Sequence, residues 1–157
     1  MALMAVAIVG CGGGENNAAD DGQATAPLTE EEYQAKVEEL SQDMQNLQTE
    51  LTTRAQEIDP TDTDAMKAIL DEFKAPLVEF AALNAPEKYQ AAQEKFKSSS
   101  EQMILFIDTT KELVDLQADP ANADAAAIQE KTETMTNALT QAAADLSAGQ
   151  TLLNEAK

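Results

Sequence analysis

A heptad pattern of apolar residues in the first third of the chain limits it to helical folds more firmly than any other feature. Its apolar positions are separated by steps of four and three residues, the spacing that keeps one face of an α-helix turned towards a partner. The positions are Tyr33, Val37, Leu40, Met44, Leu47, Leu51, Ala55 and Ile58. The seam would serve an intramolecular core or a homodimer equally well.

The first two predicted helices have clear start and stop signals. Thr29 followed three residues later by Glu32 is a capping-box pattern that begins the first helix, and Asp59-Pro60 ends it. The second helix is expected from about residue 62 to residue 83. Pro76 lies inside it, removes one backbone hydrogen bond and crowds the preceding turn, so we expect a kink there or two shorter helices.

Two long helices are predicted in the second half, over residues 86–117 and 122–156, with Asp119-Pro120 between them. The last has a thin apolar stripe with many alanines, which bury little area, so it should be the least firmly held. The stripe is Ile128, Met135, Leu139, Ala142, Leu146, Leu152 and Leu153. Four helices joined by short turns predict an all-α, antiparallel up-down four-helix bundle over residues 29–157, with its second helix kinked at Pro76.

Two short segments of similar sequence occur at the starts of the first and third predicted helices. Glu32-Tyr33-Gln34-Ala35 is similar to Lys88-Tyr89-Gln90-Ala91. Two related helical hairpins would explain the likeness, and so would independent reuse of residues that favour helix starts.

The charge balance and the residue types exclude several classes of function. Ten basic and 29 acidic residues give a net charge of −19, which argues against nucleic acid, since phosphate backbones need lysine and arginine. A cationic protein or loosely held divalent cations would complement this charge. The chain has no histidine, which removes haem ligation, the Glu-x-x-His di-iron motif and histidine-dependent catalysis. We therefore predict no enzyme activity, no cofactor and no specific metal site.

The N-terminus carries the only local motif with a specific chemical meaning. Residues 1–9 are almost wholly apolar, too short to cross a bilayer but long enough for a signal-peptide core. Ile8-Val9-Gly10-Cys11 follows the lipobox pattern of an aliphatic residue, a small or aliphatic residue, a small residue and cysteine. The chain therefore resembles bacterial lipoproteins in this segment.

The resemblance implies a membrane anchor. In such lipoproteins the peptide is cut between the residues matched by Gly10 and Cys11, and a diacylglycerol is attached to the cysteine sulfur. Residues 1–10 would then be the signal peptide, and the protein would stay in the cell envelope outside the cytoplasm. Gly12 is not the aspartate that retains lipoproteins at the inner membrane, which implies the outer membrane in a Gram-negative cell. Residues 11–28 have no apolar period and read as a flexible linker.

A ligand or partner region is predicted around the proline of the second helix. Kinks open space between helices, so the aromatic residues on either side of Pro76 could line a pocket for an apolar ligand as well as pack a core. The region consists of Phe73, Pro76, Phe80 and, from the serine run of the third helix, Ser99. The sequence thus predicts a membrane-anchored lipoprotein with a non-enzymatic binding or structural domain. The alternative is a carrier of a small apolar ligand or divalent cation, within or at the end of the bundle.

Overall fold

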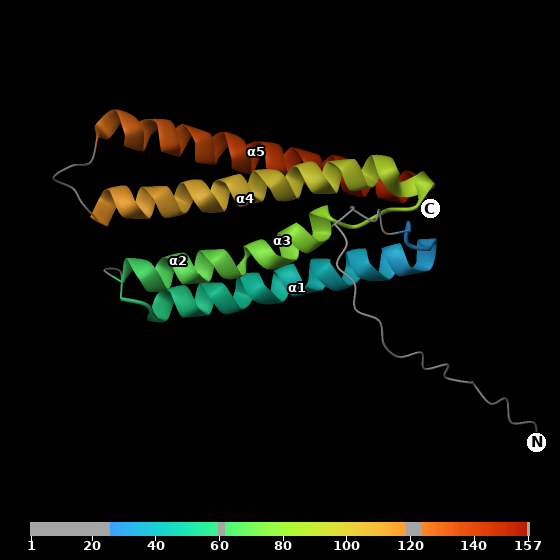
Figure 1. Cartoon of the computed structure of the whole chain (residues 1–157), viewed down its shortest axis with the longest axis horizontal. Helices are drawn as coiled ribbons and strands as arrows, with labels where there is room; N and C mark the ends of the chain where they lie inside the picture. The colour runs from blue at the N-terminus through green and yellow to red at the C-terminus, as the bar shows by residue number, and fades with distance from the viewer. Residues whose placement is uncertain (1–25, 60–61, 119–123, 157) are drawn as a thin grey trace, which may run out of the picture.

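The protein is helical throughout the part of the chain that the structure describes, residues 26–59, 62–118 and 124–156 of a computed structural model. This confirms the all-α prediction. The elements are α1 (Glu30–Glu57), α2 (Thr63–Glu72), α3 (Lys74–Ala81), a 3-10 helix η1 (Glu87–Tyr89), α4 (Gln90–Ala118) and α5 (Ala125–Glu155). Figure 1 shows two helical hairpins side by side, α1 with α2 and α3, and α4 with α5. The predicted signal peptide and Cys11 lie outside the described residues.

Helix starts follow the polar residues that the sequence provides. The Thr29 N–H donates to Glu32 Oε2 at 2.8 Å and the Glu32 N–H donates to Thr29 Oγ1 at 3.3 Å, which confirms the predicted capping box. The hydrogen bonds that the Glu32 carboxylate accepts, first from the Thr29 backbone N–H and then from the Thr29 hydroxyl, lower the pKa of Glu32. The carboxylates of Asp62 and Asp124 accept first-turn N–H groups of α2 and α5 in the same way. Each cap satisfies a backbone donor that has no partner within its helix.

The segment around Pro76 forms two short helices in series. α2 ends at Glu72 and α3 begins at Lys74, with Phe73 between them. The break lies three residues before Pro76. Proline at position 76 has no N–H to donate to the carbonyl of residue 72, and its ring crowds that carbonyl. The effect of a proline is therefore expected one helical turn before the proline, on its N-terminal side.

The core is concentrated where the first turns of α1 and α4 meet the ends of α3 and α5. Tyr33 stacks on Tyr89 with ring centroids 5.3 Å apart, and Phe80 stacks on Phe96 at 5.0 Å. The two similar tyrosine segments therefore meet at their tyrosines. Leu28, predicted as the last linker residue, packs against this core. The remaining members are Val37, Leu40, Ala85 and Ala92, with Met44, Leu83, Leu152, Leu153 and Ala156 around them.

Polar groups inside the core are bonded to one another. The Tyr33 hydroxyl donates to Gln93 Oε1 at 2.9 Å, and Gln93 Nε2 donates to the Phe80 carbonyl at 2.7 Å. Gln93 is 7 % exposed, so its amide is almost wholly withdrawn from water. Burial of the Tyr33 hydroxyl raises its pKa to about 12. Because a buried polar group without a partner is costly, this network favours one register of α1 on α4.

Helix α5 packs against α4 through its small residues. Ala138, Ala142 and Gly149 are buried on this face, and a side chain on Gly149 would run into the ring of Phe96. The predicted apolar stripe of α5 therefore coincides only partly with the face that α5 buries against α4. Leu139 is 48 % exposed and Leu146 is 38 % exposed. Small residues let the backbones of α4 and α5 approach closely. The larger leucines of α5 then lie beside this contact.

A ladder of ion pairs joins the first hairpin to α4. Lys67 pairs with Asp115, Lys111 with Asp71 at 2.6 Å, and Lys74 with Asp108. The sign alternates along each helix, so a shift by one turn would oppose like charges. The side chains are partly exposed, and such pairs contribute little stability individually. Their main effect is on register.

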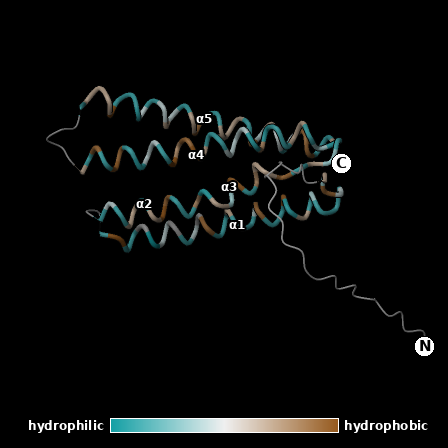
Figure 2. The backbone as a smooth tube through the Cα atoms, in the orientation of Figure 1, coloured by the Kyte–Doolittle hydropathy of each residue, from teal (hydrophilic) through white to brown (hydrophobic). Residues whose placement is uncertain are grey.

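The helices carry apolar residues at intervals and no long apolar run. Figure 2 shows hydrophobic and hydrophilic residues alternating along each helix. Among residues 26–59, 62–118 and 124–156, no helix combines the length and hydropathy needed to span a bilayer.

Candidate functional site

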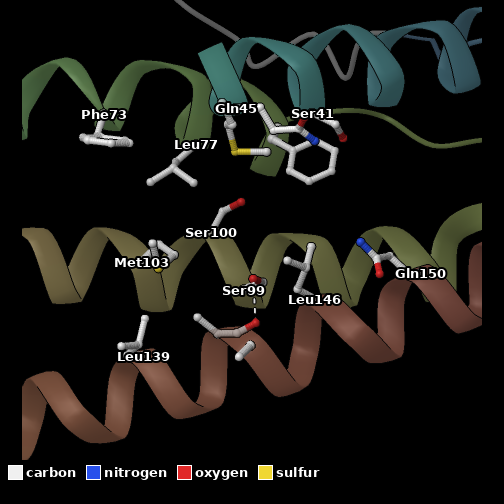
Figure 3. Close-up of a pocket in the computed structure, with 14 residues that line it drawn as sticks. Ser41, Gln45, Phe73, Leu77, Ser99, Ser100, Met103, Leu139, Leu146 and Gln150 are labelled. Carbon is white, nitrogen blue, oxygen red and sulfur yellow. Dashed lines mark hydrogen bonds between the residues drawn. The ribbon is translucent and has the colours of Figure 1, made fainter. Parts of the chain in front are cut away.

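A cleft of about 450 Å³ lies between the two hairpins. Helices α1 and α5 meet in the core at the end of α5, through Leu152, Leu153 and Ala156, and their backbones otherwise share few close approaches. Figure 3 shows side chains from both hairpins facing this space. The lining residues are Ser41, Met44, Gln45, Phe73, Leu77, Phe80, Ser99, Ser100, Met103, Leu139, Ala142, Ala143, Leu146 and Gln150.

The structure brings three of the four predicted region residues to this cleft. Phe73, Phe80 and Ser99 line it, whereas Pro76 lines a second depression of about 390 Å³ that also includes Asp43. The Ser99 hydroxyl donates to the Ala142 carbonyl at 2.8 Å, so it holds α4 to α5. Ser99 is therefore a wall residue whose donor is already used.

The next residue, Ser100, has a different environment. It is 2 % exposed, and Figure 3 shows its side chain directed into the cleft. Within the described residues, no hydrogen bond of its hydroxyl is found. Among the described residues, no fully enclosed side-chain nitrogen or oxygen lacks a hydrogen-bond partner, so the Ser100 hydroxyl is reached from the cleft and is open there to a ligand atom or a water molecule.

Charge is missing from the cleft. None of its lining residues is acidic or basic, although the chain carries 39 charged residues (10 + 29). From residue 134 to residue 154, α5 has one charged side chain, Asp145. Such a neutral surface on a strongly acidic protein is where an uncharged molecule meets the least cost of desolvation.

Asp145 is held away from the cleft by its own partners. Its carboxylate accepts hydrogen bonds from Gln141 Nε2 at 2.9 Å, Lys95 Nζ at 2.9 Å and Ser98 Oγ at 2.8 Å. These bonds, with that of Gln141 contributing most, lower the pKa of Asp145 to about 2. Asp145 therefore ties α5 to α4 as a carboxylate and adds no free acid to the site.

The polarity of the lining changes along the cleft. Figure 3 places Phe73, Met103 and Leu139 towards one end, and Ser41 and Gln150, with Leu146 near them, towards the other. The 11 residue steps from position 139 to position 150 (150 − 139) correspond to about 16 Å of helix at about 1.5 Å per residue. An elongated molecule with one apolar end and one uncharged polar end would match this gradient.

Ser100 and Leu139, which line the cleft, were not predicted from the sequence as residues of the site. Ser100 was visible only as part of the run Ser98-Ser99-Ser100, and Leu139 was assigned to the core. Both assignments depend on how α4 and α5 are rotated about their axes, which the apolar pattern of α5 leaves open.

Among the described residues, no group of three or more acidic or cysteine side chains is placed to hold a metal ion. The predicted cleavage and lipidation residues, Gly10 and Cys11, lie outside the described ranges. Comparisons with protein-family models, curated proteins and solved structures found no match to this chain.

Proposed function

We propose that this protein is a lipid-anchored lipoprotein of the cell envelope whose helical domain is a non-enzymatic binding module. The lipobox resemblance at Ile8-Val9-Gly10-Cys11 supports the anchor and an extracytoplasmic location. In this proposal residues 1–10 are the signal peptide, residues 11–28 are the linker, and residues 29–157 form an antiparallel up-down four-helix bundle bent near Pro76.

The binding site in this proposal is the cleft, and its ligand is a small apolar molecule. The observation that carries it is the uncharged lining of the cleft in a chain of net charge −19. Its volume of about 450 Å³ falls within the range of about 300–1,000 Å³ that is typical of small-molecule sites. A divalent cation as ligand has no comparable support among the described residues.

A pair of surface leucines tests the binding site. Leu139 is 48 % exposed and lines the cleft, whereas Leu105 is 43 % exposed and does not. Leu139→Asp and Leu105→Asp should therefore perturb folding to a similar, small extent. The probe is N-phenyl-1-naphthylamine, an uncharged dye that fluoresces in apolar surroundings. We expect the full chain and Leu105→Asp to bind it and Leu139→Asp to lose binding. No binding by the wild type, or equal binding by both variants, contradicts the proposal.

The anchor is tested separately in cells. A clickable palmitate analogue should label the wild-type chain, and Cys11→Ser should remove the label and release the protein from membranes. Ser98→Ala provides a control that leaves the lipobox unchanged. Persisting label on Cys11→Ser, or an unlabelled wild type in a strain that labels other lipoproteins, would remove the anchor from the proposal.

A further inference from the structure

We propose that the cleft takes an uncharged single-chain amphiphile, with its hydrogen-bonding head at Ser100 and its apolar chain along the leucines and methionines towards Leu139. This inference rests on the proposed function of the cleft and names the class of its ligand. It depends on three observations: a hydroxyl that opens on the cleft and makes no hydrogen bond among the described residues, a lining without charge, and a gradient of polarity along the cleft.

The Ser100 hydroxyl defines where the head lies. Ser99 and Ser100 are adjacent and both buried, at 6 % and 2 % exposure. Ser99 donates to the Ala142 carbonyl at 2.8 Å, whereas Ser100 faces the cleft with no such bond among the described residues. Since a hydroxyl both donates and accepts, an ester, hydroxyl or ether oxygen of a ligand would satisfy it.

The charge distribution defines what kind of head is accepted. An anionic head would enter a site without a cation, in a protein of net charge −19. The nearby ammonium group of Lys95 is paired with Asp145 at 2.9 Å. A cationic head would find no carboxylate in the lining, because Asp145 does not line the cleft and its carboxylate is bonded to three donors. Burying an unpaired charge is costly, so a neutral head is favoured.

The apolar part of the lining defines where the chain lies. Leu77, Met103 and Leu139 come from three different helices, and Figure 3 shows them along one half of the cleft. Methionine side chains adapt to irregular apolar shapes, so Met44 and Met103 can follow a flexible chain. The whole cleft, its polar end included, spans about 16 Å of helix from the level of Leu139 to that of Gln150, which suits an elongated molecule better than a compact ring system.

The experiment compares two probes that share one chain and differ in head charge. 1-Monolauroylglycerol is neutral and laurate is an anion at pH 8. Each is titrated calorimetrically into the full chain below its critical micelle concentration, in 0.15 M salt. We expect the neutral probe to bind at least about tenfold more tightly, which corresponds to about 1.4 kcal/mol and is within the value of one hydrogen bond plus an avoided charge burial.

The two serines supply the matched variants. Ser100→Ala removes the hydroxyl that opens on the cleft, so we expect about tenfold weaker binding of 1-monolauroylglycerol together with an unchanged melting temperature. Ser99→Ala removes a bond between α4 and α5, so the melting temperature should fall while the preference for the neutral probe stays. Weaker binding at an unchanged melting temperature would not arise from a purely structural role of Ser100.

The site of binding is read from methionine methyl groups. With ¹³C-methyl methionine, the resonances of Met44 and Met103 should shift on adding the neutral probe, and that of Met66, which does not line the cleft, should stay. Equal binding of both probes, or Ser100→Ala binding like the wild type, overturns this inference and leaves an apolar cleft. If neither probe binds and the dye fails too, the proposed function itself falls. A dimer that Leu139→Asp converts to a monomer would show that a second copy occupies the cleft, which also overturns the inference.

Discussion

Replacing Gly149 by alanine tests the close packing of α5 on α4 that leaves the cleft open. A Cβ at this position would lie 2.6 Å from Phe96 Cε1 and 2.7 Å from Phe96 Cδ1, and 3.3 Å from the Ala92 carbonyl oxygen. Ordinary contact begins near 3.4 Å, so the ring would have to retreat by about 0.8 Å (3.4 − 2.6). Phe96 is 2 % exposed and stacks on Phe80 at 5.0 Å, so it has little room to do so.

Two effects of opposite sign decide the result. Alanine in place of glycine inside a helix contributes about 1 kcal/mol of stability through backbone entropy. Overpacking a well-filled core costs about 1–3 kcal/mol, and a rigid, stacked ring places this site in the upper half of that range. We therefore expect Gly149→Ala to lower the free energy of unfolding by about 1–2 kcal/mol, against the direction of helix propensity.

The measurement is urea unfolding of the full chain, followed by far-ultraviolet circular dichroism. Ala144→Gly, at an exposed position of α5, is the matched control and should cost about 1 kcal/mol from propensity alone. In a Phe96→Leu background the clash is relieved, so adding Gly149→Ala there should be neutral or stabilising. A Gly149→Ala variant at least as stable as the wild type would refute the reasoning, because the two helices would then be further apart than described.

Two pH effects follow from the shifted pKa values. Hydrogen bonds from Gln141, Lys95 and Ser98 lower the pKa of Asp145 from 3.8 to about 2, so the stability that they contribute is present above about pH 4 and is lost as the pH falls towards 2. In urea unfolding, the free energy of unfolding should therefore fall more between pH 5 and pH 3 for the wild type than for Asp145→Asn. Burial raises the pKa of Tyr33 from 10.0 to about 12, so its contribution is full below pH 10 and is lost as the pH rises towards 12. Tyr33→Phe should flatten that alkaline loss, and an identical pH profile in either variant would contradict the corresponding assignment.

Local signals in the sequence were enough to place the helices. The capping box at Thr29 and the acid at Asp62 start helices where expected, because caps act over three or four residues and need no tertiary partner. Tyr33, Val37 and Leu40 of the heptad seam are buried as predicted. The break at Phe73 lies next to residue 72, whose carbonyl a proline at position 76 would leave without its helical partner.

The candidate site was only partly predictable. Phe73, Phe80 and Ser99 were named from a proline and a serine run, and they line the cleft. Ser100 and Leu139 were not, because neighbouring residues on a helix differ by about 100° in direction and the apolar pattern of α5 is too thin to set its rotation.

The sequence by itself determined the secondary structure, the acidic surface and the absence of histidine chemistry, since each depends on residue type and short-range spacing. Only the tertiary structure decided which faces meet. α5 turns Ala142 and Gly149 to α4 because small residues permit the closest approach, and Phe96 fills the space that the glycine leaves. That choice leaves Leu139 and Ser100 facing an open cleft, and it is a collective result of packing that no single stretch of the chain encodes.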